Sequence, residues 1–248
     1  MAAALSPSFT PAALRHLLAA AQKNNFALGP FLPGPLARRV KSKRDLENQI
    51  RGLLKNLGLV IGRAKMHAFG RRAAALAKNR PQLAAAIDPL LTARTAIEQQ
   101  LADLDRKVML LARHNAQARR FMTAPGVGPI TAVCFLATID DPTRFKRSRS
   151  VGAYLGLTTR RFASGEVDWT GRISKGGDKM LRSYLYEAAH VILTRVKKWS
   201  ALKAWGVRIA KRTGLLKATV AVARKLAVIL HRMWIEGTEF KWSKEAVN

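Results

Sequence analysis

The sequence predicts a mainly α-helical protein, in which a long coiled-coil-like helix precedes a compact helical domain with a helix-hairpin-helix motif and a short irregular or β-hairpin loop. Three observations lead to this prediction. Apolar residues follow a heptad pattern from Leu83 to Leu111. A Pro-Gly-Val-Gly turn at 125–128 separates two apolar stretches. Between residues 158 and 179, β-prone residues alternate with polar residues and glycines.

The composition limits the class of protein. The chain has 248 residues, which suggests one or two domains, and its hydrophobic content of 48% excludes a wholly disordered chain. No apolar run approaches the roughly 18–20 residues that span a bilayer, so we expect no membrane partner. The single cysteine, Cys134, excludes an intramolecular disulfide and a cysteine-based zinc site. This cysteine usage is typical of a reducing compartment, and we expect a cytoplasmic protein.

The charge of the chain indicates a polyanionic partner. There are 44 Lys and Arg against 15 Asp and Glu, which gives a formal net charge of +29. Two long stretches, 1–44 and 188–235, contain no acidic residue, and tryptophans stand among the basic residues of the second. Such a pattern favours nucleic acid as the first candidate and an anionic membrane surface as the second, because each neutralised phosphate releases condensed counterions. A solvated basic face without a fixed partner is the alternative interpretation.

The first half of the chain divides into two parts. Residues 1–40 are expected to form a loosely ordered basic leader, with a short helix at 11–22 followed by an irregular linker rich in Pro and Gly. Residues 41–117 are expected to form a helical connector. Its first helix begins at Ser42 and places Leu46, Ile50, Leu53 and Leu54 on one side.

The connector's strongest pattern is an apolar seam with alternating spacings of four and three residues. The seam consists of Leu83, Ile87, Leu90, Arg94, Ile97, Leu101, Leu104, Val108 and Leu111. Arg94 is its one polar position, and Pro89 should kink the first third of the helix. The seam fits a coiled coil between two subunits, packing against another helix of the same chain, or an ordinary amphipathic core helix.

The segment FMTAPGVGPITA, residues 121–132, predicts a helix that ends near Met122 and another that begins at Pro129. Read as a helix-hairpin-helix, it would hold a DNA phosphate at the start of the second helix, where backbone N–H groups are free. Gly126, Gly128 and Thr131 are therefore candidate DNA-binding residues. A plain connection between two helices is the alternative.

The remaining chain is expected to complete a domain over residues 118–245. A basic helix is expected over 144–157, and an irregular loop or short β-hairpin should follow it. Two closing helices are expected at about 178–196 and 215–237.

Four of these segments together resemble the IS110-family transposases, in the domain named transposase IS116/IS110/IS902. They are PGVGPITA (125–132), RFKRSRSVGAYLGL (144–157), RRFASGEVDWTGRISKGGDKMLRSYLYEAA (160–189) and KATVAVARKLAVILHRMW (217–234). The resemblance covers roughly residues 41–245. It implies a transposase or site-specific recombinase of an insertion sequence that binds transposon ends and target DNA. In some members a structured guide RNA also takes part.

The resemblance also implies site residues. The family's nucleophilic serine lies in a Ser-Gly pair, which here is Ser164, with Ser174 as the second choice. Cations beside a serine stabilise the charge that gathers on phosphate oxygens during attack. The candidate DNA-binding cations are Arg144, Lys146, Arg147, Arg160, Arg161, Arg172, Lys175, Lys217, Arg224 and Lys225.

The chain departs from the family in its acidic residues. The family carries four acids that bind Mg²⁺ in an N-terminal RuvC-like domain, whereas the first acid here is Asp45. We therefore expect an N-terminally truncated member with no metal site or cofactor of its own. It would form homo-oligomers or pair with a full-length transposase that supplies the acids. The alternative functions are a non-enzymatic basic DNA- or RNA-binding protein and an RNA-associated structural protein.

Overall fold

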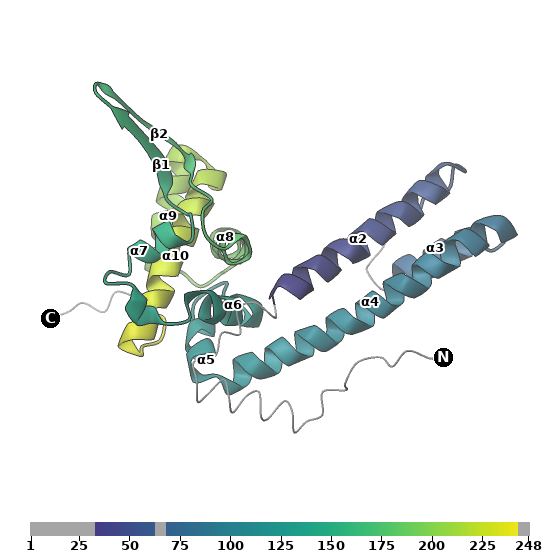
Figure 1. The fold of residues 1–248 in the computed structure, drawn as a ribbon, viewed down its shortest axis with the longest axis horizontal. Coiled ribbons are helices and arrows are strands. Elements are labelled where there is room, and N and C mark those ends of the chain that lie inside the picture. Colours follow the sequence, from purple (N-terminus) through teal and green to yellow (C-terminus); the bar gives the residue numbers. More distant parts are fainter. Residues whose placement is uncertain (1–32, 63–67, 243–248) are drawn as a thin grey trace. The chain divides into compact units, whose positions relative to one another are not determined.

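The computed structural model describes residues 33–62 and 68–242. These residues form two compact units, one within residues 32–107 and one from Val108 onward. Both are mainly helical, as the sequence predicts (Figure 1). The helix expected at 11–22, and most of the leader, lie outside the described residues.

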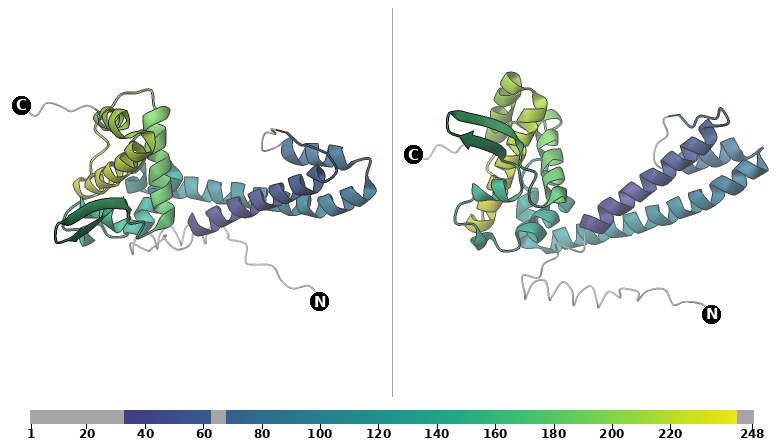
Figure 2. Two further views of the ribbon diagram at one scale, coloured as in Figure 1. Left: turned by 90° about the horizontal axis from the view of Figure 1, so that it is seen from above. Right: turned by 45° about the horizontal axis from the view of Figure 1, so that its top comes forward.

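The first unit consists of α2 (Pro33–Lys55), α3 (Phe69–Ala77) and most of α4 (Pro81–His114). Figure 2 shows α2 running alongside α4. The core of this unit joins all three helices and the segment that follows α2. Its fully packed members are Ile50, Leu54, Ile61, Phe69, Ala73, Ala77, Leu83 and Ile87. Of the apolar positions predicted for the first helix, Ile50 and Leu54 belong to this core and Leu53 packs against it, whereas Leu46 is half-buried outside it.

Helix α2 begins earlier than the sequence suggested. It includes Pro33 and Pro35, which were expected to belong to an irregular linker. Proline is compatible with the first turn of a helix, because the N–H groups there have no partner within the helix in any case. The two prolines thus lie in the first turn of a helix and not in an irregular linker.

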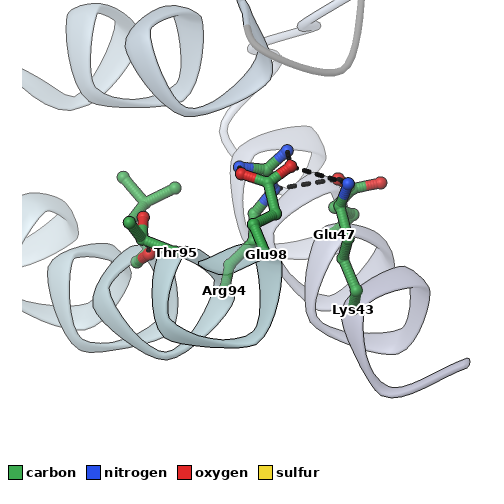
Figure 3. Close-up of polar contacts among 6 residues, drawn as sticks. Lys43, Glu47, Arg94, Thr95 and Glu98 are labelled. Carbon is green, nitrogen blue, oxygen red and sulfur yellow. Dashed lines mark hydrogen bonds and ion pairs between the residues drawn. The ribbon is translucent and has the colours of Figure 1, made fainter. Parts of the chain in front are cut away.

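Four charged residues join α2 to α4 at the seam's one polar position (Figure 3). Arg94 is 3% exposed and contacts Glu47 and Glu98, each at 2.8 Å. Lys43 is 8% exposed and lies 2.6 Å from Glu98. The two cations and two carboxylates balance in charge, which is the condition under which buried charges are tolerated.

The seam of α4 is continuous, and the helix extends through Pro89 without ending. Within the first unit, the residues of the seam are buried or half-buried, and α2 covers the seam near Arg94. Packing against a helix of the same chain, one of the expected alternatives, is therefore present. A coiled coil between two subunits stays a prediction.

The second unit begins with the last residues of α4, which ends at His114. Asn115 then caps the next helix, and its side chain accepts a hydrogen bond from the Ala118 N–H at 2.8 Å. Its helices are α5 (Ala116–Met122), α6 (Pro129–Ile139), α7 (Ser150–Tyr154), α8 (Lys179–Thr194), α9 (Ala201–Thr213) and α10 (Leu215–Glu236). The short 3₁₀ helix η2 (Pro142–Arg144) precedes α7. The end of α5 and the start of α6 lie where the sequence placed them.

Helix α10 is central to this unit and packs against α5, α7, α8 and α9. Its buried face includes Val222, Leu226 and Leu230, all without exposed surface. Helix α9 approaches it closely at Gly206, where a Cβ atom would lie 2.5 Å from a methyl group of Val222. The sequence analysis missed α9, although Ser200 caps it by accepting from the Lys203 N–H and Gly214 follows its last residue.

The basic helix expected over 144–157 is wrong. The structure instead has η2, a stretch of turns and the five-residue helix α7. The buried side chain of His231 accounts for this irregular path. Its Nε2 donates to the Pro142 carbonyl at 2.9 Å, and its Nδ1 lies 3.0 Å from Ser148 Oγ. These two bonds to α10 hold the segment in a non-helical conformation.

The loop expected after residue 157 is an antiparallel β-hairpin, formed by β1 (Thr159–Ser164) and β2 (Val167–Ile173). It projects beyond the helices of the second unit (Figure 1). A bulge lies between Thr159 and Arg161, and Gly165, with a φ of +55°, helps to form the turn at the tip.

Candidate nucleic-acid interface

The ten predicted DNA-binding cations are all exposed. They lie in four places in the second unit: beside η2, on the hairpin, in the loop after it, and on α10. The side chain of Arg224 extends across α7, where a Cβ atom on Gly152 would lie 2.9 Å from its Cγ. These exposed positive side chains can meet phosphate groups without any rearrangement of the core.

The turn between α5 and α6 uses its two glycines differently. Gly126 has a φ of +75°, and a Cβ atom there would lie 2.5 Å from the carbonyl oxygen of Ala188 in α8. Gly128 is the N-cap of α6 and has open space around its Cα. Thr131 is 8% exposed, in the first turn of α6. Gly126 therefore has a packing role, whereas a Cβ atom at Gly128 would meet no other atom. Phosphate binding at this helix start stays a prediction.

The hairpin holds the two candidate serines at opposite ends. Ser164 is exposed at the tip and pairs with Val167, whereas Ser174 follows the base. Six residues along β1 from Ser164 to Thr158, which lies opposite Ser174, correspond to about 20 Å. Ser174 is fixed through its backbone, which donates to the Thr158 carbonyl at 2.8 Å and accepts from Arg160 at 3.0 Å. The two serines thus present different surroundings to a phosphate.

The cations predicted beside the serine are distributed along the hairpin. Arg160, Arg172 and Lys175 lie near its base, closer to Ser174 than to Ser164. Arg161 lies opposite Thr170 and donates two hydrogen bonds to Asp168, one of them at 2.8 Å. This pairing lowers the pKa of the Asp168 carboxyl and raises the pKa of Arg161.

The base of the hairpin is tied to α7 through backbone packing. A Cβ atom on Gly156 would lie 2.2 Å from the Gly176 carbonyl oxygen, and one on Gly177 would lie 2.0 Å from that of Tyr154. Arg182 in α8 donates to the carbonyls of Leu155 at 3.1 Å and Gly176 at 2.7 Å. The sequence analysis did not single out Arg182. The only feature of the sequence that could have indicated its role is its position four residues after Asp178, the N-cap of α8.

Lys175 is one of two non-glycine residues with positive φ in the described chain, at +56°. Its N–H donates to the Gly156 carbonyl at 3.1 Å. Left-handed backbone at such a residue is strained and persists where surrounding contacts enforce it. The loop therefore fixes the backbone of Lys175 beside the base of the hairpin, and its side chain is exposed.

Metal binding does not fit the described residues. Within 33–62 and 68–242, no three His, Cys, Asp or Glu side chains converge as a metal site would require. Asp168 is engaged by Arg161, and the Asp178 carboxylate accepts from the Leu181 N–H at 2.6 Å. In the same part of the chain, no helix is long and apolar enough to cross a membrane.

Comparison with known proteins identifies the second unit. Residues 118–205 match the family described as "Transposase IS116/IS110/IS902 family". This segment extends from the start of α5 into α9 and includes the α5–α6 turn and the hairpin. The chain contains an IS116/IS110/IS902 family transposase domain.

Relatives of this transposase domain extend the similarity beyond the matched segment. The chain is 32% identical over 198 residues to the "Transposase for insertion sequence element IS1111A" of Coxiella burnetii, which covers 78% of this chain and 54% of the relative. It is 31% identical to the "Putative transposase y4pF/y4sB" of Sinorhizobium fredii, over 85% of this chain and 56% of the relative. The "Probable family 20 transposase" of Pseudomonas aeruginosa is 31% identical, over 78% and 59% respectively. The chain thus spans little more than half the length of these relatives.

Proposed function

We propose that this chain acts in DNA transposition as the DNA-binding, serine-carrying part of an IS110-like transposase. The observation that carries this proposal is the family domain at 118–205, together with exposed cations on the same unit. A net charge of +29 supports binding to a polyanion. The relatives named as transposases are much longer than the region they share with this chain. The proposal therefore rests on the family domain and on the charge of the chain, and not on the names of the relatives.

Ser164 is proposed as the nucleophile. Its hydroxyl is exposed, and no hydrogen bond engages it among the residues that the structure describes. Attack by Oγ on a DNA phosphodiester would form a serine–phosphate ester and expel one deoxyribose oxygen, which takes up the proton that the serine loses. Of the predicted cations, Arg161 is the nearest to Ser164 along the hairpin, and cations that reach the phosphate would stabilise the negative charge on its oxygens during this step.

The acidic residues for catalysis are proposed to come from a second polypeptide, a full-length transposase that binds Mg²⁺. The charge pairing of Asp168 and the capping role of Asp178 support this, because both carboxylates are already engaged. The seam of α4 offers a surface for pairing chains, through the half-buried Ile97, Leu101 and Leu104. A structured guide RNA is a further proposed partner.

A suicide DNA substrate that carries candidate element ends tests the proposal. The chain is incubated with this DNA and Mg²⁺, with and without a full-length relative whose own nucleophilic serine is replaced. We expect a covalent adduct at the size of this chain only when the relative is present. Ser164→Ala should abolish the adduct, and the matched variant Ser174→Ala should retain it.

The other outcomes are equally informative. An adduct without the relative would overturn the dependence on a second polypeptide. An adduct lost only in Ser174→Ala would move the nucleophile to the base of the hairpin. Salt-sensitive binding with no adduct in any mixture would favour the non-enzymatic DNA-binding protein. Preferential competition by a structured RNA from the element, over an unrelated RNA, would support the guide RNA.

A further inference from the structure

The hairpin carries an aromatic pair that the fold leaves exposed. The rings of Phe162 and Trp169 stack with centroids 4.2 Å apart and an angle of 17° between their planes. These residues are direct partners across the two strands. Phe162 is 44% exposed and Trp169 is 53% exposed, so the pair lies outside the core of the unit.

A glycine next to the pair leaves room for both rings. A Cβ atom on Gly171 would lie 3.2 Å from a ring carbon of Phe162 and 3.2 Å from one of Trp169. Such contacts are tighter than ordinary van der Waals packing, so a side chain at this position would press on the rings. The hairpin therefore holds two aromatic rings together, each with an outer surface turned to solvent.

The surroundings of the pair indicate which partner it fits. Arg161 directly precedes Phe162 on β1, while Arg160, Arg172 and Lys175 lie toward the base. Flat rings beside cations match a nucleotide, whose base stacks on an aromatic ring while its phosphate meets a guanidinium group. An apolar protein partner would leave Arg160, Arg172 and Lys175 without counter-charges, whereas Arg161 is already paired with Asp168. The charge of the chain favours the same choice.

The conformation of the DNA follows from the geometry of stacking. Bases in an intact duplex stack on one another, so their faces are open to a protein ring only where the strand is unpaired or unstacked. Ser164 lies two residues after Phe162 on β1, which puts both side chains on one face of the strand and about 7 Å apart along it. A base on the rings would thus belong to a nucleotide near Ser164.

We propose that Phe162 and Trp169 form a stacking platform for unpaired bases of the DNA strand that Ser164 attacks. This proposal rests on the proposed function and adds the state of the DNA that the hairpin recognises. The platform separates paired from unpaired DNA, whereas the exposed cations bind the phosphates of both.

Fluorescence anisotropy with two labelled DNAs tests the platform. One is a duplex, and the other is the same duplex with a short run of mismatched bases that forms a bubble. We expect the chain to bind the bubble more tightly than the duplex. Trp169→Ala and Phe162→Ala should each weaken bubble binding roughly 5- to 100-fold, the range expected for one lost base–aromatic stack. Duplex binding should change less than about twofold, and Trp169→Tyr should keep most of the preference for the bubble.

Trp199 provides the matched control. It is 60% exposed in the same unit, outside the hairpin, with Lys203 5.3 Å from its ring centroid. Trp199→Ala should leave the ratio of bubble to duplex affinity unchanged. A 2-aminopurine placed in the bubble should be quenched by the wild-type chain and not by Trp169→Ala. Circular dichroism checks that each variant is folded.

The proposal is overturned if Trp169→Ala weakens binding to bubble and duplex by the same factor, or if Trp199→Ala has as large an effect on the ratio. It is also overturned if the wild-type chain binds both DNAs equally and the 2-aminopurine is not quenched. In that case DNA binding, and with it the proposed function, would still stand. Failure to bind either DNA would instead overturn the proposed function, and the platform with it.

Discussion

The Nε of Arg94 donates a hydrogen bond of 2.8 Å to Glu47 Oε1 and so joins two helices at positions 47 residues apart in sequence. The same guanidinium binds both carboxylate oxygens of Glu98, each at 2.8 Å. It also lies 5.2 Å from the centre of the Phe69 ring. Arg94 is thus the point at which α2, α3 and α4 meet.

Loss of this contact should destabilise the first unit strongly. Arg94→Ala would leave two carboxylates in a half-buried place with Lys43 as their remaining cation in the cluster. We expect the free energy of unfolding to fall by about 3–5 kcal/mol, as when one partner of a buried pair is removed. Urea denaturation followed by circular dichroism measures this change.

Arg106 gives the control for that experiment. It pairs with Asp103 on the same helix, but the two side chains are 75% and 56% exposed. Arg106→Ala should cost less than about 1 kcal/mol, because exposed ion pairs contribute little. Equal losses in Arg94→Ala and Arg106→Ala would contradict the interpretation that burial gives the Arg94 contacts their importance.

The two glycines of the α5–α6 turn should respond differently to the same substitution. Gly126→Ser should destabilise the second unit by about 1–3 kcal/mol or more, because the new Cβ meets the Ala188 carbonyl and the positive φ is strained. Gly128→Ser should change stability by less than about 0.5 kcal/mol, since serine is a good N-cap and space is available. Thermal or urea unfolding of both variants checks this. Similar losses would contradict the packing role of Gly126.

Exposed cations beside α7 should contribute to DNA binding through counterion release. The double variant Lys146→Gln/Arg147→Gln should reduce the slope of log K against log salt by about 1.8, from about 0.9 per lost phosphate contact. Arg106 is already paired with Asp103, so the variant Arg106→Gln should leave the slope unchanged. Titrations at four or more salt concentrations measure the slope. An unchanged slope in the double variant would remove these two cations from the interface.

The buried thiol of Cys134 should make stability fall at high pH. Burial, assisted by the negative charge of Asp178, raises its pKa to about 12 in the folded chain. Unfolded thiols ionise near pH 8.5, so between about pH 9 and 12 the unfolded state loses its proton first and is favoured. The stability that the protonated, buried thiol contributes to the folded chain is therefore fully present below pH 8.5, and it is lost as the pH rises from 8.5 toward 12.

Two measurements check this prediction. Cys134→Ala should show a shallower loss of stability between pH 9 and 11 than the wild-type chain. Because Cys134 is the only cysteine, its reaction with a thiol reagent reports on this site alone. That reaction should be much slower in the folded chain than in denaturant. Rapid labelling of the folded chain would contradict the burial.

Local patterns predicted the elements whose signals lie within a few residues. The helix end at Met122, the start at Pro129 and the long helix through the seam follow from glycine, proline and apolar spacing. The hairpin follows from alternating β-prone residues around Ser164 and Gly165. The segment from 144 to 157 departs from its expected helix because a distant residue, His231, holds it.

The helical class, the strong positive charge, the place of the α5–α6 turn and the motifs shared with IS110-like transposases can all be read from the order of residues alone. The packed fold was needed to show that Glu47 neutralises Arg94, that Ser164 and Ser174 lie at opposite ends of one hairpin, and that Phe162 stacks on Trp169. Periodicity and turn residues act through neighbouring bonds of the chain, whereas the partner of a buried charge or an aromatic ring depends on which distant segments pack together.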